Sequence, residues 1–568
     1  MTVARLTLEH VDALRAALTQ FGGSTAAAKT AALGACARRA LDDPEVLIAY
    51  HDALLFALAY PETAALRNSA RRELRRVAGA TRALVESGPA RVRSRLENTG
   101  LAWSALTINF GWDIARWLVE RFPRHAELDQ FGVDGARLAA VLQHALPPAE
   151  FELVAGDEPD PLALVLRASA GHRGTKLAWL VHALRRLPCS EALREHLFDA
   201  LQPFLTIRPA GTMLSRTFVR GLAAPTFFHR TPLIRTVDLQ ALVATPLGPA
   251  RRPSASERVH IVDAGRAMLA ALGRETDAVA GSYPDGVAWH DLGRGAALAL
   301  YTIRPDHRGA FDSHVGFLLF RNGLPVGYGG GWPFLGTCKI GVNIFAPYRG
   351  GESAWLFGQV LRVYAQRFAV QRFVAEPSQI GHANPDGLKS GAYWFYYRLG
   401  FRSAEPKLAR VADEEFARMT ADRRYRSPIA TLRRFTRADL ELPLAQGDWQ
   451  GGRGGSVDPA DLSLAVSDWI ARRHRGDRGA ALAAATRSVS RALGASGIDR
   501  WPDAERGAFG NLSLLFAQIP GLARWPHGDR RRVVQLMRAK GGDEFRYFAL
   551  LQRHRRLRAA LEDIARTR

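Results

Sequence analysis

The stretch Lys339-Ile-Gly-Val-Asn-Ile-Phe-Ala-Pro-Tyr-Arg-Gly-Gly-Glu-Ser-Ala354 passes from an extended pattern to a helical one. Residues 339–345 are mostly apolar and predict a buried strand. A turn with Pro347 and two glycines follows, and from Ser353 apolar residues recur at helical spacing. A strand that enters a helix through a glycine-rich turn directs backbone N–H groups and the positive end of the helix dipole toward an anion. The stretch therefore predicts an α/β unit that can hold an anion at this turn.

The residues on either side predict the rest of this unit. The strand candidates are residues 296–303, 315–320, 324–329, 338–345 and 372–375. Asn322-Gly323 lies between the second and third of them, and Asn-Gly between apolar runs is the strongest short hairpin signal. The predicted helices are residues 353–368 and 391–399, and Gly400 ends the second. The predicted order is strand, hairpin, strand, loop, helix, strand, helix.

This ordered set resembles the GNAT superfamily, whose members transfer an acyl group from acyl-CoA, usually to an amine. The family's loop reads Arg/Gln-x-x-Gly-x-Gly/Ala, and Arg349 and Ala354 match its first and last positions. Its last helix often ends in Tyr-x-x-x-Gly-Phe, which is matched by Tyr396, Gly400 and Phe401. The resemblance covers about residues 296–402. It implies a mixed sheet with a V-shaped cleft between the strands that end near residues 345 and 376.

Two positions depart from the family's pattern. Glu352 replaces the middle glycine of the loop, and Lys389 stands where the last helix often carries Asn. We expect the Glu352 carboxylate to face the bound pyrophosphate and, unless it turns away, to repel it by on the order of 1 kcal/mol. A catalytically degenerate GNAT-like binding or scaffold protein is therefore an alternative to an enzyme.

The resemblance also assigns site residues. The residues expected to bind the acyl-CoA cosubstrate are Asn343, Phe345, Arg349, Gly350, Gly351, Ser353 and Ala354. Tyr396 is the expected general acid for the departing thiolate, unless it merely packs against the sheet. Glu376 is the candidate general base, and the alternative is an ion pair with a surface arginine. Weaker candidates are His307, Asp312, His314 and His382.

The remaining chain divides by composition and period. We expect a helical domain over residues 1–200, an irregular proline-rich connecting segment over 201–255, and the GNAT-like domain over 256–410. Residues 411–456 form the predicted linker, with glycine-rich residues 446–455, and residues 457–568 a basic helical domain. The predicted fold class is thus α/β, flanked by N-terminal and C-terminal all-α regions.

The chain of 568 residues carries a net charge of +22, and nearly all of this excess lies after residue 200. A basic region of this size attracts polyanions, so RNA, the phosphates of CoA and an acidic carrier protein are the expected partners. A solvated basic surface is the alternative. Nearly all the cations are arginine, as in proteins from GC-rich genomes.

Several classes of protein are not supported. There is no apolar run near 18 residues and no secretory signal pattern, and the three cysteines lie far apart, which favours a reducing cytoplasm. The sequence has no Cys-x-x-Cys, no His-Glu-x-x-His, no Gly-Lys-Ser/Thr loop and no Gly-x-Ser-x-Gly, so no metal site is predicted. The favoured function is acyl transfer from acyl-CoA or an acylated carrier to an amine acceptor by direct attack. The acceptor can be a small molecule or a macromolecule, RNA and aminoacyl-tRNA included.

Overall fold

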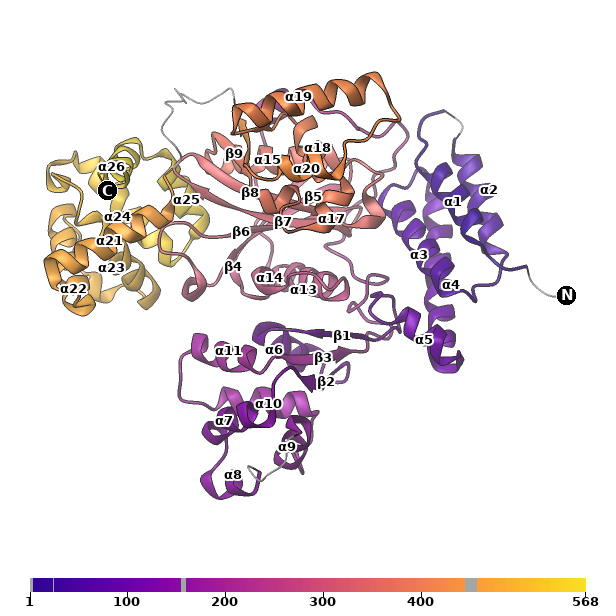
Figure 1. The fold of residues 1–568 in the computed structure, drawn as a ribbon, viewed down its shortest axis with the longest axis horizontal. Helices are drawn as coiled ribbons and strands as arrows, with labels where there is room; N and C mark the ends of the chain where they lie inside the picture. The colour runs from indigo at the N-terminus through magenta and orange to yellow at the C-terminus, as the bar shows by residue number, and fades with distance from the viewer. Residues whose placement is uncertain (1–3, 24, 155–159, 445–456, 568) are drawn as a thin grey trace.

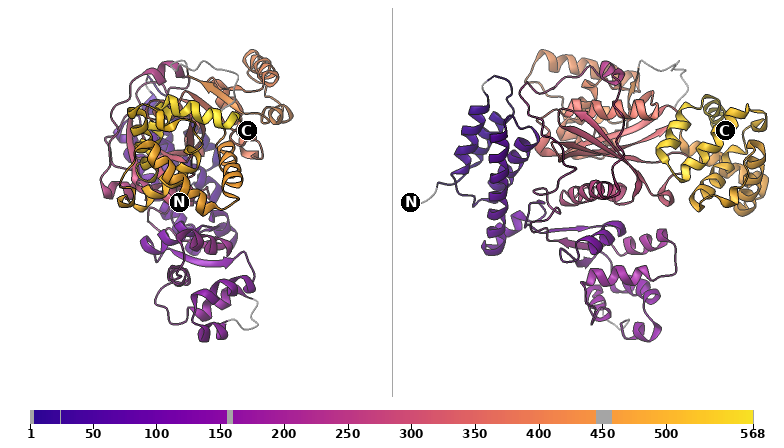
Figure 2. Two further views of the ribbon diagram at one scale, coloured as in Figure 1. Left: turned by 90° about the vertical axis from the view of Figure 1, so that its left-hand side faces the viewer. Right: turned by 180° about the vertical axis from the view of Figure 1, so that it is seen from behind.

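The computed structural model describes residues 4–23, 25–154, 160–444 and 457–567. A central mixed sheet lies between the N-terminal helices and the C-terminal helices, and a smaller α/β unit lies beneath it (Figure 1). Figure 2 shows the same four parts from the side and from behind. The candidate site is built on the central sheet.

The central sheet has eight strands in the order β10-β11-β9-β8-β7-β6-β5-β4. Neighbours are antiparallel except β8 and β9, which are parallel. The bounds are β4 (Ser282–Gly293), β5 (Ala296–Ile303), β6 (Val315–Arg321), β7 (Leu324–Phe334), β8 (Thr337–Ile344), β9 (Arg372–Ala375), β10 (Arg402–Ser403) and β11 (Leu440–Pro443). The expected order of strands and helices from β5 to the helix at Ala392 is confirmed.

Helices cover both faces of this sheet (Figure 1). On one face α15 (Ser353–Phe368) is tied down by the Tyr364 hydroxyl, which donates to the carbonyl of Val315 at 2.5 Å. On the other face lie α13 (Ala255–Ala271), which begins with a capping box, and α14 (Asp277–Ala280). The remaining helices of this domain are α16 (Pro377–Ile380), α17 (Pro385–Ser390), α18 (Ala392–Arg398), α19 (Pro406–Ala421) and α20 (Ile429–Phe435).

The first 200 residues form two units. The N-terminal helices are α1 (Leu8–Leu18), α2 (Thr25–Ala37), α3 (Pro44–Ala59), α4 (Ala64–Ser87) and α5 (Ala90–Leu96). The second unit has a three-stranded sheet in the order β1-β3-β2, with bounds β1 (Leu106–Asn109), β2 (Ala126–Phe131) and β3 (Pro203–Ile207). Its helices are α6 (Trp112–Arg121), α7 (Gly135–Ala145), α8 (Pro148–Val154), α9 (Pro161–Ala168), α10 (Lys176–Arg185) and α11 (Glu191–Ala200).

The expectation that residues 1–200 are entirely helical, and with it the all-α N-terminal region, was therefore wrong. β1 and β2 are too short to show clear alternation, and both pair with β3, which follows them by over 70 residues. An ion pair fastens this unit to the central domain, because Arg304 at the end of β5 donates to both carboxylate oxygens of Asp113 on α6.

The predicted connecting segment is largely irregular, with α12 (Leu239–Ala244) inside it. The predicted linker over 411–456 was wrong for its first part, because α19 and α20 occupy it and β11 pairs with β9. A strand that joins the sheet from so far along the chain has no local signal. The glycine-rich residues 446–455 lie outside the described residues.

The C-terminal helices are α21 (Pro459–His474), α22 (Arg478–Leu493), α23 (Asp503–Phe516), α24 (His527–Gly541), α25 (Glu544–Arg553) and α26 (Arg555–Arg566). They are helical as expected, but α25 also belongs to the central domain's core. Its Phe545 and Phe548 rings pack on Phe368 of α15 with centroids 6.0 Å apart. Across the described residues, no helix combines the length and apolarity that a bilayer crossing needs.

Candidate functional site

A cavity of about 770 Å³ opens where β8 and β9 part. The two strands are paired only from Thr337 to Lys339 of β8 and from Arg372 to Val374 of β9. Beyond that point β8 continues to Ile344 beside β7 alone, and its other edge borders the cavity. The parallel pair is therefore open at its carboxyl end, which leaves backbone groups of β8 free for a ligand.

This cavity reaches both faces of the sheet. Gly341, Val342, Asn343 and Ile344 of β8 all line it. Because successive residues of a strand point to opposite faces, a cavity lined by all four passes the free edge of β8 from one face to the other. Two molecules can thus enter from opposite sides and meet beside β8.

On the α15 side, the turn between β8 and α15 supplies the polar groups. Arg349 and Ser353 line the cavity, and Arg349 Nε donates to the carbonyl of Ile344 at 3.0 Å. The first backbone N–H groups of α15 have no side-chain cap, because the N-cap residue Glu352 makes none. Among the described residues, the buried Ser353 hydroxyl has no hydrogen-bond partner. This wall can therefore receive an anion.

Glu352 does not face the cavity, which corrects the expectation that it would repel a bound phosphate. Its side chain is 0% exposed and forms ion pairs with Arg321 and, at 2.7 Å, with Arg294. It also accepts a hydrogen bond from the backbone N–H of Ile234 at 2.9 Å, and its own N–H donates to the Tyr60 hydroxyl at 3.2 Å. The carboxylate thus points into the core.

The remaining loop residues shape the turn without lining the cavity. Gly351 is buried, and a Cβ there would overlap the ring of Tyr60, the residue that follows α3. Phe345 is buried, donates its N–H to Val326 at 3.0 Å and stacks on Tyr328. Gly350 is exposed and Ala354 half-buried. Of the seven residues expected to bind the cosubstrate, Asn343, Arg349 and Ser353 line the cavity.

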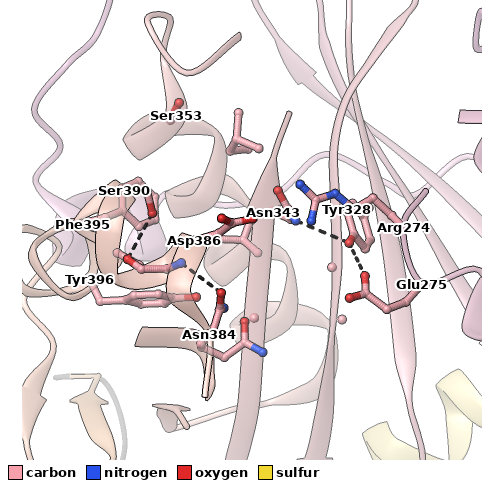
Figure 3. A pocket seen from close by; sticks show the side chains of 18 of the residues that line it. Arg274, Glu275, Tyr328, Asn343, Ser353, Asn384, Asp386, Ser390, Phe395 and Tyr396 are labelled. Atoms are coloured by element: carbon pink, nitrogen blue, oxygen red, sulfur yellow. Dashed lines mark hydrogen bonds between the residues drawn. The ribbon is translucent and has the colours of Figure 1, made fainter. Parts of the chain in front are cut away.

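Tyr396 on α18 lines the cavity from the α15 side (Figure 3). Its ring packs against Phe357 and Phe401 at centroid distances of 5.6 and 5.3 Å. The hydroxyl lies near the backbone N–H of Val342 but, within the described chain, makes no hydrogen bond of normal geometry. Burial raises its pKa above the ordinary value, so the hydroxyl keeps its proton at neutral pH.

Glu376 is placed differently from Tyr396. It forms an ion pair with Lys339 at 2.9 Å, both side chains are at least 40% exposed, and neither lines the cavity. The ion-pair alternative is thus the one observed, although the partner is a lysine. His307 pairs with Glu195 of the second unit at 3.0 Å, and Asp312 and His382 do not line the cavity either. His314 does.

The opposite half of the cavity holds residues for which no role was predicted, apart from the weaker candidate His314. Tyr328 on β7 donates to Glu275 at 2.6 Å and accepts from Asn343 Nδ2 at 3.4 Å (Figure 3). This hydrogen bond holds the pKa of Glu275 below its usual value, while burial raises the pKa of Tyr328. Glu275 follows the glycine that ends α13, so its loop position was the only available signal.

A row of glycines makes room for this half. Gly316, Gly330 and Gly341 are directly opposite one another on β6, β7 and β8, and Tyr301 of β5 completes the row. A Cβ on any of the three would overlap a side chain that lies flat over the sheet: Tyr301 over Gly316, His314 over Gly330, and Gln379 over Gly341. The three glycines therefore let these side chains lie close against the sheet.

Comparison with protein-family models, with curated proteins and with solved structures gave no match for this chain.

Proposed function

We propose that this protein is an acyltransferase that moves an acyl group from acyl-CoA to an amine. The proposal rests chiefly on the cavity that passes the free edge of β8 and opens to both faces of the sheet. Such a passage lets a thioester and an amine approach from opposite sides, as direct transfer without a covalent enzyme intermediate requires.

The chain's residues fit the cosubstrate. Three features suit a pyrophosphate: the uncapped start of α15, the Arg349 guanidinium, and the Ser353 hydroxyl, which has no hydrogen-bond partner within the described part of the chain. Glu352 is no obstacle, since two arginines neutralise it in the core. The backbone of β8 beyond Lys339 has no β9 partner and suits the amide groups of an extended pantetheine arm.

Bound acyl-CoA would supply an activated thioester. The amine nitrogen attacks the carbonyl carbon, the new C–N bond forms and the C–S bond breaks. Tyr396, protonated at neutral pH, gives its proton to the departing sulfur. The proton lost by the nitrogen returns through water to the Tyr396 oxygen. Free backbone N–H groups of β8 stabilise the charge that develops on the carbonyl oxygen.

Titration calorimetry of the full chain with acetyl-CoA and with free CoA tests the donor half directly. We expect both ligands to bind, and saturating the protein with one of them should abolish the heat of binding of the other. A thiol-release assay with a mixture of amines then tests transfer. Absence of CoA binding by the folded protein would overturn the proposal, because transfer from acyl-CoA requires that the protein bind it.

A further inference from the structure

The half of the cavity on the α13 side has a chemistry of its own. It brings together one carboxylate, one guanidinium and a set of aromatic rings: Glu275, Arg274, Tyr301, His314, Tyr328 and Trp332. None of these belongs to the turn before α15. They come from the loop after α13, from β5 and β7, and from the loop that leads into β6.

We propose that the acceptor is a free α-amino acid with an aromatic or large apolar side chain, bound as its zwitterion between Arg274 and Glu275. This inference rests on the proposed function, since it names the amine that the acyl group reaches. The amino acid's ammonium group faces Glu275, its carboxylate faces Arg274, and its side chain lies on the aromatic wall.

The two charged residues in this half of the cavity, Arg274 and Glu275, are consecutive in sequence, and no ion pair joins them in the described structure. Within the described ranges of the chain, no carboxylate forms an ion pair with Arg274. Glu275 accepts a hydrogen bond from Tyr328, and its own backbone N–H and the nearby charge of Arg274 also help to lower its pKa. Tyr328 donates its one hydroxyl hydrogen to Oε2 of Glu275, and Glu275 is exposed, so its carboxylate can also accept from a ligand cation. A ligand with both an ammonium and a carboxylate satisfies this pair of residues, whereas a simple amine leaves Arg274 unmatched.

The wall behind these charges suits a flat or bulky side chain. Trp332 is 40% exposed at the rim, and its ring lies 4.8 Å from that of His314, which lies 6.3 Å from Tyr301. Burial lowers the pKa of His314 to about 4, so the imidazole is neutral at pH 7 and does not repel an ammonium group. Because Gly316 and Gly330 have no side chain, Tyr301 and His314 lie close against the sheet, which leaves room in front of this wall.

The position of the pair also fits the reaction. Asn343 contacts Tyr328 and lies on the free edge of β8, so Glu275 is two hydrogen bonds from the strand beside which the thioester would lie. Tyr396 and Glu275 enter from opposite sides of the cavity (Figure 3). The ammonium group first loses one proton to water, and the neutral nitrogen beside Glu275 then approaches from the side opposite to Tyr396.

Calorimetry on the full chain saturated with free CoA tests this inference without turnover. The probes are L-phenylalanine, L-phenylalaninamide, which lacks the carboxylate, 3-phenylpropanoate, which lacks the ammonium group, and L-alanine, which lacks the ring. We expect phenylalanine to bind at least tenfold more tightly than each of the other three, because each of them loses one of the three contacts.

Two variants assign the contacts. Arg274→Gln should weaken phenylalanine at least tenfold and leave phenylalaninamide unchanged. Glu275→Gln should weaken both and leave 3-phenylpropanoate unchanged. The matched controls are Arg410→Gln and Glu405→Gln, exposed residues on or next to α19, and they should change none of these affinities. Circular dichroism shows whether each variant is folded.

Equal affinity for phenylalanine and its amide, or no amino-acid binding by a protein that binds CoA, would overturn the amino-acid assignment and leave the acyltransferase proposal intact. If CoA fails to bind while phenylalanine still binds with the expected variant pattern, the acyltransferase proposal falls and an amino-acid site remains. The two failures are thus distinguishable.

Discussion

The two sides of the turn between β8 and α15 use charge in opposite ways. On the core side, Glu352 is fully enclosed by Arg321, Arg294 and the N–H of Ile234. On the cavity side, Arg349 is exposed and bonded only to a backbone carbonyl in the described chain, and Ser353 has a hydroxyl with no partner there. Polar groups on the core side are paired with other groups of the protein, whereas those on the cavity side are free to pair with a ligand.

Neighbouring residues of the turn therefore have different roles: Glu352 stabilises the fold, and Ser353 is available to a ligand. A buried ion pair fixes the direction of the turn, and the turn then presents unsatisfied donors at a set place. Substitutions on the core side should change stability with little effect on ligand affinity, and substitutions on the cavity side should do the reverse. The predictions that follow test this contrast.

The largest effect is expected for Glu352→Gln. It leaves the buried Arg321 without its counter-charge, and breaking a buried pair costs about 3–5 kcal/mol. Urea unfolding followed by circular dichroism measures the loss. The matched control is Glu376→Gln, whose pair with Lys339 is exposed and should contribute less than about 1 kcal/mol. Equal effects of the two substitutions would remove the contrast.

Tyr396→Phe should lower kcat about 10²-fold, the usual contribution of a general acid, with no loss of stability. Stability is kept because, within the described residues, the buried hydroxyl makes no hydrogen bond that could be lost. Tyr393→Phe is the control, since that hydroxyl is equally buried and unpartnered there but does not line the cavity. A large drop in kcat for Tyr393→Phe would indicate a packing effect of α18.

Arg349→Ala should raise the Kd for CoA about tenfold, because a charge-assisted contact to phosphate contributes about 1.5–3 kcal/mol. The melting temperature should stay within about 1 °C, since the side chain is exposed and has a single hydrogen bond to the backbone in the described structure. Calorimetry and thermal unfolding check the two halves of the prediction. A lowered melting temperature with unchanged Kd would place Arg349 on the scaffold side.

The smallest effect concerns pH. The hydrogen bond from Tyr328 holds the pKa of Glu275 below its usual value. The carboxylate therefore stays charged as pH falls, and acceptor binding is lost only when pH drops through that lowered pKa. Tyr328→Phe removes the bond, so the acid limb of kcat/KM should move to higher pH, by about one unit or less. An unchanged limb would show that Glu275 does not control acceptor binding.

Local periodicity predicted much of the central domain. The expected strands at 296–303 and 372–375 and the helix at 353–368 have the observed bounds, because short apolar runs and apolar helical spacing are both local patterns. β4 was missed, since Pro284 and Gly286 interrupt its pattern, and its pairing with β5 shifts register there.

Side-chain direction could not be predicted in the same way. Glu352 is held by arginines 31 and 58 residues before it, so the motif around it carries no sign that it points inward. Glu275 was missed for the related reason that it becomes part of the cavity only through Tyr328, on a strand formed much later in the chain. Motifs report backbone geometry, whereas the partners of a charge are set by the tertiary fold.

The glycine row across β6, β7 and β8 carries a thermodynamic cost. Glycine within a strand or helix destabilises the folded protein by roughly 0.5–1 kcal/mol relative to alanine, because an unfolded glycine has more conformational entropy to lose. Three such glycines therefore cost about 1.5–3 kcal/mol. Alanine at Gly316, Gly330 or Gly341 would recover that entropy only by displacing Tyr301, His314 or Gln379. The glycines thus keep these three cavity-lining side chains close to the sheet at a cost in stability. Alanine substitutions chosen for thermostability would push the side chains into the cavity.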